Sequence, residues 1–192
     1  MTPDTVLQFW LDEVGPAGWY AAGEALDNEV RARFAASWDE MMEGAFGLWL
    51  TYPGGALAYL ILTDQFPRNM FRDTGKSFAS DAVARAAAKA AIDHDWDLMI
   101  HEPARQFFYM PLMHSETLTD QDRAVRLFCA RMPETGENNR LHARAHRDVI
   151  RRFGRFPTRN AALGRVNTPE EAAWLRDGGY GATLRALETA TA

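Results

Sequence analysis

Apolar residues recur at spacings of three and four along most of this chain. After Asp27, the side chains of Val30, Phe34, Trp38 and Met41 follow that spacing. The period is that of an α-helix with one buried face. Because aspartate is a preferred helix-capping residue, we expect Asp27 to begin this helix.

A second segment is apolar on every side. Residues 57–62 read Leu-Ala-Tyr-Leu-Ile-Leu without a polar position. A helix with this pattern is surrounded by protein, so it should be the central helix of the fold. We expect it to end before Pro67, because proline lacks an N–H donor and restricts the residue before it.

Start and stop signals divide the remaining chain into further helices. Only 11 residues are Val or Ile, which disfavours strands. The predicted starts are Thr2-Pro3-Asp4, Thr119 with Asp122, and Thr168-Pro169-Glu170-Glu171, and the predicted stops are Gly154 and 177–179. The sequence therefore predicts an all-α single domain over residues 1–192, with about eight helices, in which residues 184–192 form a last short helix or a frayed tail.

Composition fits a folded protein with a buried core. The chain has 192 residues, 47% of them hydrophobic and 24% charged, with a net charge of −5. That charge argues against general nucleic-acid binding. No apolar run approaches the roughly 20 residues that span a membrane, and Met1-Thr2-Pro3-Asp4 lacks the basic flank and apolar run of a signal peptide, so we expect a soluble cytoplasmic protein. Cys129, the only cysteine, falls in an apolar helical pattern and is expected in the core.

Arginine is unusually frequent. The chain has 19 arginines and two lysines, and residues 140–165 contain eight arginines and the single acid Asp148. One interpretation is codon usage in a GC-rich genome. The other is that several guanidinium groups bind carboxylate or phosphate.

Two similar phrases place charged groups beside a phenylalanine and a proline. They read Asp-Gln-Phe-Pro-Arg-Asn at 64–69 and Phe-Gly-Arg-Phe-Pro-Thr-Arg-Asn at 153–160. A charged group near a core is costly unless it has a partner. We therefore expect both phrases, together with residues 105–116, to form one polar constellation.

Four residues are candidates for acid–base chemistry: Asp64, His114, Glu116 and His146. Asp64 lies four residues before Arg68, so it either forms an ion pair that fixes the turn or anchors a ligand. His114 and Glu116 are two residues apart and could transfer protons, or they could orient a loop.

Eight further residues are candidates for ligand binding: Arg68, Asn69, Arg105, Tyr109, Arg152, Arg155, Arg159 and Asn160. Asp148 lies four residues before Arg152 and is expected to pair with it. Arg155 and Arg159 then need other anions, which Asp64 and Glu116 could supply, or which a bound anionic ligand could supply.

His142 and His146 are four residues apart, a spacing that can hold a metal. Neighbouring arginines would repel a cation and no HExxH pattern occurs, so no metal site is predicted. His142 is expected to be a core histidine, whereas a functional role for His146 stays open. No glycine-rich nucleotide loop, GxSxG elbow or CxxC pair is present, and no cofactor is predicted.

Taken in order, these motifs resemble the bacterial family called domain of unknown function 924. The resemblance rests on 64–69, on Tyr109-x-Pro-x-x-His-Ser-Glu at 109–116, on His146 with 150–157, and on 163–165 and 168–171. It implies an all-helical, tetratricopeptide-like fold without an established activity. It also implies shared polar positions at Asp64, Arg68, Asn69, Arg105, His114, Glu116, His146, Arg152, Arg155, Arg159 and Asn160. Thr158 stands where the family usually has histidine, and Ala104 where an acid is common, so position 158 is given no essential role.

Three functions are compatible with these residues. The first is a binder of, or enzyme acting on, a small phosphorylated or carboxylated metabolite through a pocket lined by Arg, His and Asp. The second is a protein-interaction module of the tetratricopeptide-like kind. The third is a purely structural polar network. Six Trp and 11 Phe could also leave an apolar patch for a homodimer or another protein partner.

Overall fold

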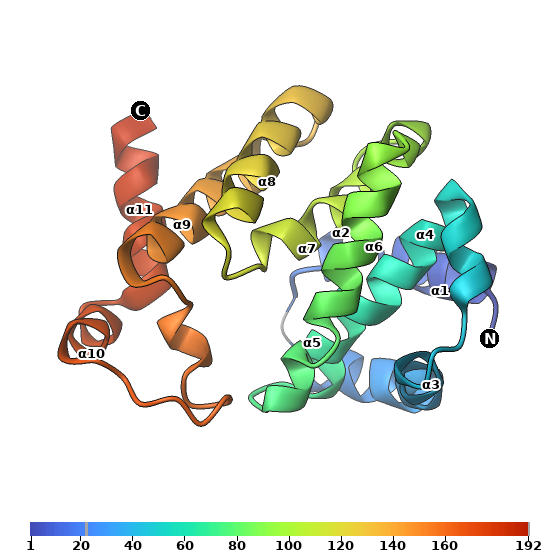
Figure 1. Ribbon diagram of the computed structural model, residues 1–192, viewed down its shortest axis with the longest axis horizontal. Coiled ribbons are helices and arrows are strands. Elements are labelled where there is room, and N and C mark those ends of the chain that lie inside the picture. Colours follow the sequence, from blue (N-terminus) through green and yellow to red (C-terminus); the bar gives the residue numbers. More distant parts are fainter. Residues whose placement is uncertain (22, 192) are drawn as a thin grey trace. The chain divides into compact units, whose positions relative to one another are not determined.

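The structure, a computed structural model, describes residues 1–21 and 23–191 and is built from helices (Figure 1). Within those residues every regular element is an α-, 3₁₀- or π-helix. The all-α fold class is therefore confirmed, in keeping with the scarcity of β-branched residues. The chain groups into two compact units, Met1–Pro111 and Leu112–Ala192. One domain over residues 1–192 stays a prediction.

The first unit contains the more numerous and shorter elements. In chain order they are α1 (Pro3–Leu7), the π-helix η1 (Gln8–Val14), α2 (Gly15–Gly18), α3 (Glu24–Met42), the 3₁₀-helix η2 (Gly47–Thr51), α4 (Pro53–Leu60), the π-helix η3 (Ile61–Gln65), α5 (Phe66–Met70), and then η4 (Gly75–Phe78), α6 (Asp81–Asp93), η5 (Trp96–Met99), η6 (Ala104–Phe108) and the start of α7 (Met110–Met113).

Closely packed aromatic rings form the core of the first unit. The ring centroid of Phe34 lies 5.0 Å from that of Phe9 and 4.5 Å from that of Phe66. The Trp10 ring meets the Phe66 ring edge-on at 5.4 Å. All four side chains are almost completely buried. Each such burial is worth roughly 1.5–3 kcal/mol, so this cluster fixes how η1, α3 and α5 pack.

The expected end before Pro67 is wrong, because the helix continues through the proline. The wider turn of η3 comes first, and Pro67 then takes a position in the first turn of α5, where its missing N–H is tolerated. Two side chains donate hydrogen bonds to backbone carbonyl oxygens of η3. Ser80 Oγ donates to the Thr63 carbonyl at 2.6 Å, and Arg68 donates to the Asp64 carbonyl. Tertiary contacts thus bring Asp64 and Arg68 into the interior.

The expected cap at Asp27 is also wrong. Helix α3 begins at Glu24 after Gly23, and Asp27 lies inside its first turn. Its carboxylate pairs with Arg72 from beyond α5 instead of capping the helix. By contrast, Thr2 caps α1 as predicted, with its hydroxyl 3.3 Å from the Thr5 backbone nitrogen.

The second unit contains fewer and longer helices. They are α8 (Leu118–Arg131), α9 (Glu137–Phe153), the 3₁₀-helix η7 (Pro157–Arg159), α10 (Pro169–Arg176) and α11 (Gly179–Thr191). Helices α8 and α11 both pack against α9 (Figure 1). Val149, Ile150, Phe156 and Trp174 form the buried centre.

Two helix ends in this unit confirm the sequence signals. Gly154 ends α9 with a left-handed φ of 69°, and its N–H bonds to the Ile150 carbonyl. Thr168 and Glu171 form a complete capping box at the start of α10. In the expected tail, residues 184–191 belong to the longer α11, and Ala192 lies outside the described residues.

Two expectations for α8 are wrong. Thr117, and not Thr119, precedes the helix, and it makes no side-chain capping bond. Cys129 is exposed, because α8 turns Ala124 and Phe128 toward the protein instead. None of the helices in residues 1–21 and 23–191 has the length and apolar character that crossing a bilayer requires.

Candidate functional site

The residues predicted to carry chemistry divide between the two units. The first unit holds Asp64, Arg68, Asn69, Arg105 and Tyr109. The second unit holds His114, Glu116, His146, Arg152, Arg155, Arg159 and Asn160. A single constellation of all twelve residues therefore stays a prediction, whereas smaller clusters are visible inside each unit.

Asp64 and Arg68 form a buried ion pair. The Asp64 side chain is 1% exposed, and it accepts a hydrogen bond from Gln65 Nε2 at 2.6 Å. Arg68 Nη1 lies 3.4 Å from Asp64 Oδ1, and Arg68 Nη2 lies 3.0 Å from Asp81 Oδ1. Burial lowers the pKa of Arg68, but Asp64 and Asp81 outweigh that effect and raise it above the ordinary value. These contacts favour the ion pair that fixes the turn.

Asn69 belongs to a different cluster, centred on Asp27. Asn69 Nδ2 donates to Asp27 Oδ1 at 2.9 Å. Arg72 donates two hydrogen bonds to the same carboxylate, from Nε to Oδ2 at 2.7 Å and from Nη2 to Oδ1 at 2.8 Å. This fork is the main reason that the pKa of Asp27 is lowered. The cluster joins α3 to α5.

Arg105 and Tyr109 both converge on the segment of η5. Asp97 is fully buried and accepts the Tyr109 hydroxyl hydrogen bond at 2.5 Å. Arg105 Nε donates to the carbonyl oxygens of Asp97 and Ile100 at 3.1 and 3.0 Å. Arg105 is thus held by backbone oxygens and by an ion pair with Glu102, whose Oε1 lies 3.6 Å from Arg105 Nη1.

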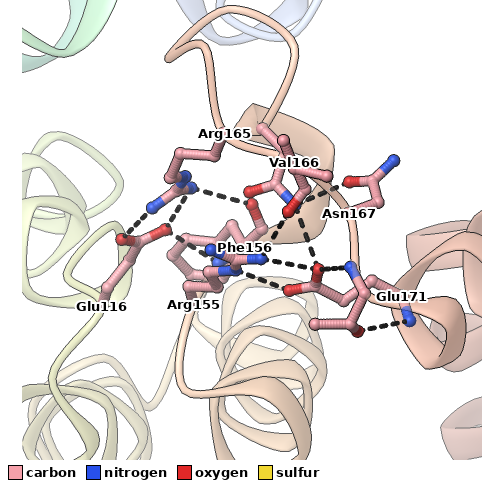
Figure 2. A network of polar contacts seen from close by, with 9 residues as sticks. Glu116, Arg155, Phe156, Arg165, Val166, Asn167 and Glu171 are labelled. Carbon is pink, nitrogen blue, oxygen red and sulfur yellow. Dashed lines mark hydrogen bonds and ion pairs between the residues drawn. The ribbon is translucent and has the colours of Figure 1, made fainter.

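Arg155 and Asn160 hold the start of α10 in the second unit. Figure 2 shows Arg155 facing Glu171. Arg155 Nε and Nη2 donate to the two oxygens of Glu171 at 2.6 and 2.7 Å. Asn160 Nδ2 lies 3.3 Å from Glu171 Oε2, and the Thr168 backbone N–H donates to the same oxygen at 2.7 Å. The fork from Arg155 is the largest cause that lowers the pKa of Glu171, to about 2.

Glu116 forms the second half of the network in Figure 2. Arg165 Nη1 and Nη2 donate to its two carboxylate oxygens at 2.8 and 2.9 Å, and the Phe156 backbone N–H donates to Oε1 at 2.8 Å. Burial alone would raise the pKa of Glu116, but these donors lower it. Glu116 is thus an anchored carboxylate that closes residues 156–165 into a loop.

The arginine partners expected from the sequence are different in the structure. Arg155 forms an ion pair with Glu171, and Glu116 forms one with Arg165. The suggested pairing of Arg155 with Asp64 or Glu116 is therefore wrong. Arg152 Nε bonds to Glu170 at 2.9 Å. Its expected partner Asp148 lies beside Arg147 and Arg151 instead.

His146 is the centre of a third cluster, which we call the His146 cluster. It consists of His114, His142, His146, Phe156, Arg159 and Tyr180. The His146 ring centroid lies 6.2 Å from the His114 ring, 5.3 Å from the Phe156 ring and 4.8 Å from the Tyr180 ring. Tyr180 was not predicted as a site residue, because nothing near Gly178-Gly179 in the sequence links it to a histidine.

Arg159 brings a positive charge to the His146 cluster. Its guanidinium carbon lies 4.5 Å from the centroid of the Phe156 ring, and Nη2 donates to the His114 carbonyl oxygen at 2.9 Å. His114, His146 and Arg159 are each partly exposed, so solutes can reach the cluster.

Hydrogen bonds define which nitrogen of His146 carries the proton. His146 Nδ1 lies 2.8 Å from the His142 carbonyl oxygen, and a carbonyl can only accept, so Nδ1 must be the donor. The Tyr180 hydroxyl lies 2.7 Å from His142 Nδ1 and 3.2 Å from His146 Nδ1. It therefore donates to His142. In neutral His146, the lone pair lies on Nε2.

The environment keeps His146 uncharged. Burial is the largest cause that lowers its pKa, to about 3, and the charges of His114 and Arg159 lower it further. Burial also lowers the pKa of His142 and raises that of Tyr180. Within residues 1–21 and 23–191, no group donates a hydrogen bond to His146 Nε2. The nitrogen is thus available as an acceptor at neutral pH.

The His146 cluster combines an acceptor nitrogen with nearby positive charge. Such a pair can hold an anionic group and a neighbouring hydroxyl, or accept a proton from it. In the described part of the chain, no group of three His, Cys, Asp or Glu side chains is arranged to hold a metal ion.

Comparisons with known proteins agree with the resemblance seen in the sequence. The profile of the family described as "Bacterial protein of unknown function (DUF924)" matches residues 6–179. A solved structure titled "Structure of Protein of Unknown Function ATU0120 from Agrobacterium tumefaciens" matches at 36% identity with a TM-score of 0.84. The match covers 91% of this chain and 97% of the Agrobacterium chain. No curated protein matches the chain.

Proposed function

The chain belongs to the DUF924 family of bacterial proteins, and from that premise we propose that its second unit binds a small anionic metabolite at the His146 cluster. Phosphorylated and carboxylated metabolites are the ligand class. The family description names no activity, so the proposal rests on the contacts of these residues. Asp64 and Glu116, the other acid–base candidates, are not placed in the reaction.

One observation carries the proposal: His146 presents an unengaged Nε2 lone pair beside positive charge. The guanidinium of Arg159 is permanently charged and lowers the pKa of His146, so it contributes a positive potential at this ring. An anion close to the ring would be attracted to that potential. Titratable groups with strongly shifted pKa values are enriched at functional sites, which adds support.

The same geometry suggests what the ligand carries besides its charge. Arg159 supplies N–H donors, which suit a phosphate or carboxylate oxygen. His146 Nε2 supplies an acceptor, which suits a hydroxyl or amine hydrogen. A ligand with a hydroxyl beside its anionic group, such as a sugar phosphate or a hydroxy acid, would use both.

A different role is favoured for three of the predicted ligand-binding arginines. Arg68, Arg152 and Arg155 each face a carboxylate of the protein itself. We infer that Arg68 and Arg155 stabilise the fold, because each connects segments that are distant in sequence. The structural reading of the polar network thus applies to these residues, and the ligand-binding reading to the His146 cluster.

The experiment is a thermal-shift screen of the purified protein with inorganic phosphate and a panel of phosphorylated and carboxylated metabolites. A ligand present at 100 times its Kd adds about 2.7 kcal/mol to the free energy of unfolding, which gives a clear rise in Tm. We expect a hit among hydroxylated anions.

Two variants link a hit to the cluster. Arg159→Gln removes the cation and His146→Asn removes the Nε2 acceptor, so each should abolish the Tm rise at that ligand concentration. His101→Asn, at an exposed histidine of the first unit, is the matched control and should keep it. A rise that survives both cluster variants would place binding elsewhere, and no rise with any anion would refute the proposal.

A further inference from the structure

Two recesses adjoin each other at the turn between α8 and α9, away from the residues of the His146 cluster. The first, about 220 Å³, is lined on one side by Phe128, Met132 and Pro133. The second is about 320 Å³. Glu137 and Arg140 line both recesses. Their sizes suit a small ligand or part of one.

Two arginines of α9 line this double recess without a carboxylate partner. Arg140 Nη1 lies 3.9 Å from Cys129 Sγ, which is a weak contact. Among the described residues, Arg144 makes no hydrogen bond or ion pair. Both side chains are partly exposed and stand one helical turn apart. Farther along the same helix, Arg147 and Arg151 both reach Asp122.

Charge and wall chemistry together indicate the ligand. Arg140 and Arg144 contribute two positive charges and Glu137 one negative charge, so the net local charge is +1. A single net positive charge matches a monoanion better than a dianionic phosphate. The apolar wall of Phe128, Met132 and Pro133 would cover an apolar body.

We propose that the double recess is a second binding site, which takes a monoanionic carboxylate with an apolar body, such as an aryl or alkyl acid. The carboxylate contacts Arg140 and Arg144, and the apolar body lies against Phe128 and Met132. The site uses none of the residues of the His146 cluster, so each proposal can fail without the other.

The exposed thiol at this site reports whether the recess is occupied. Cys129 lines the first recess and is the only cysteine, so alkylation by iodoacetamide reads this position alone. The probe is 3-phenylpropanoate. If the bound probe shields the thiol, a concentration of ten times its Kd should slow alkylation about tenfold.

Matched variants separate the charge from the apolar contact. Arg140→Gln and Arg144→Gln should each weaken the protection, whereas Arg176→Gln, at an exposed arginine of α10, should leave it unchanged. Arg140 lies beside the thiol, so its replacement can itself change the alkylation rate. For each variant, the alkylation rate with the probe is therefore compared with the rate of the same variant without it. His146→Asn should also leave it unchanged. Calorimetry of 3-phenylpropanoate with Cys129→Ser measures binding directly, even if the probe leaves the thiol uncovered.

The result that supports the site is calorimetric binding that both Arg140→Gln and Arg144→Gln reduce. Three results overturn it. The first is no binding at millimolar probe to folded protein. The second is equal binding of the neutral 3-phenylpropanamide, because the carboxylate would then be irrelevant. The third is binding of inorganic phosphate that is tighter than that of the probe and that Arg140→Gln and Arg144→Gln weaken, because the monoanionic assignment of this recess would then be wrong.

Discussion

Individual arginines in this protein occupy two kinds of environment. Arg68, Arg155 and Arg165 each meet a carboxylate of the chain itself, in contacts between 2.6 and 3.4 Å. Arg140 and Arg144, in contrast, face a recess. An arginine with an internal partner stabilises the fold, whereas an arginine without one is available to a ligand.

Replacing Arg68 by Met should destabilise the protein strongly. The change removes the Arg68 guanidinium from the buried Asp64 carboxylate, and removing one partner from a buried pair costs about 3–5 kcal/mol. Arg152→Met is the comparison, because the Arg152–Glu170 pair is exposed and should cost no more than about 1 kcal/mol. Urea unfolding of both variants measures the difference. Equal losses would show that the Asp64–Arg68 pair does not support the fold.

His146 should make stability depend on pH above the range in which carboxylates titrate. Its folded-state pKa of about 3 lies below the ordinary value of 6.5, so the unfolded chain binds the proton first. The stabilising contribution is complete above pH 6.5 and is lost as pH falls toward 3, with a slope of at most about 1.4 kcal/mol per pH unit.

The measurement is the free energy of unfolding at several pH values between 6.5 and 5. His146→Asn should flatten the dependence relative to the unchanged chain, and His101→Asn should not. His142, whose pKa is also lowered, leaves a residual slope in both proteins. An unchanged slope in His146→Asn would mean that this imidazole is not held neutral.

Residue pairing was the least predictable feature at this scale. The sequence indicated that Arg155 needs an anionic partner and left Asp64, Glu116 or a bound ligand as possibilities, but not the partner that it has. Arg155 pairs with Glu171, which lies 16 positions away, and Glu116 pairs with Arg165, which lies 49 positions away. The local spacing of residues does not show which of the eight arginines in the segment 140–165 pairs with a given carboxylate. The pairing depends on how the loop after α9 folds back.

At the scale of helices, local chemistry decided the ends where no distant contact competed. Thr168 and Gly154 were predicted correctly, since a capping box and a left-handed glycine are local devices. Pro67 and Asp27 were predicted wrongly. In both cases a distant side chain, Ser80 or Arg72, supplies a hydrogen bond that changes the local preference.

Gly154→Ala should destabilise the end of α9. Residue 154 has φ of 69°, and an added Cβ would meet no atom within 4 Å, so the cost comes from the left-handed backbone alone. We expect a loss of about 1–2 kcal/mol. Gly47→Ala, which also meets no atom but has an ordinary φ, should be nearly neutral. Thermal unfolding of both variants tests this, and similar Tm values would contradict the strain at residue 154.

At the scale of the whole molecule, the all-α class and the family were predictable and the division into units was not. Helical periodicity is repeated along the chain and survives local errors. The family motifs are long and ordered, and the profile match over residues 6–179 confirms the family that they indicated. The boundary between the two units falls between Pro111 and Leu112, inside α7, where the sequence carries no linker signal.

The candidate site was predictable only in part at this scale. His114, His146 and Arg159 were named from the sequence, and the structure brings them together in the second unit. The hydroxyl of Tyr180, the tautomer of His146 and the double recess were not foreseen. They depend on how α8 and α11 pack on α9, which the sequence pattern does not specify.

The most direct test of the account is a ¹H–¹⁵N spectrum of the histidine side chains, recorded between pH 5 and 8 with and without inorganic phosphate. We predict that His146 stays neutral throughout, with its proton on Nδ1, that phosphate shifts its Nε2 signal, and that Arg159→Gln removes this shift. If His146 instead titrates near pH 6.5, and phosphate moves its signals no more than those of the exposed His101, the proposed anion site is wrong.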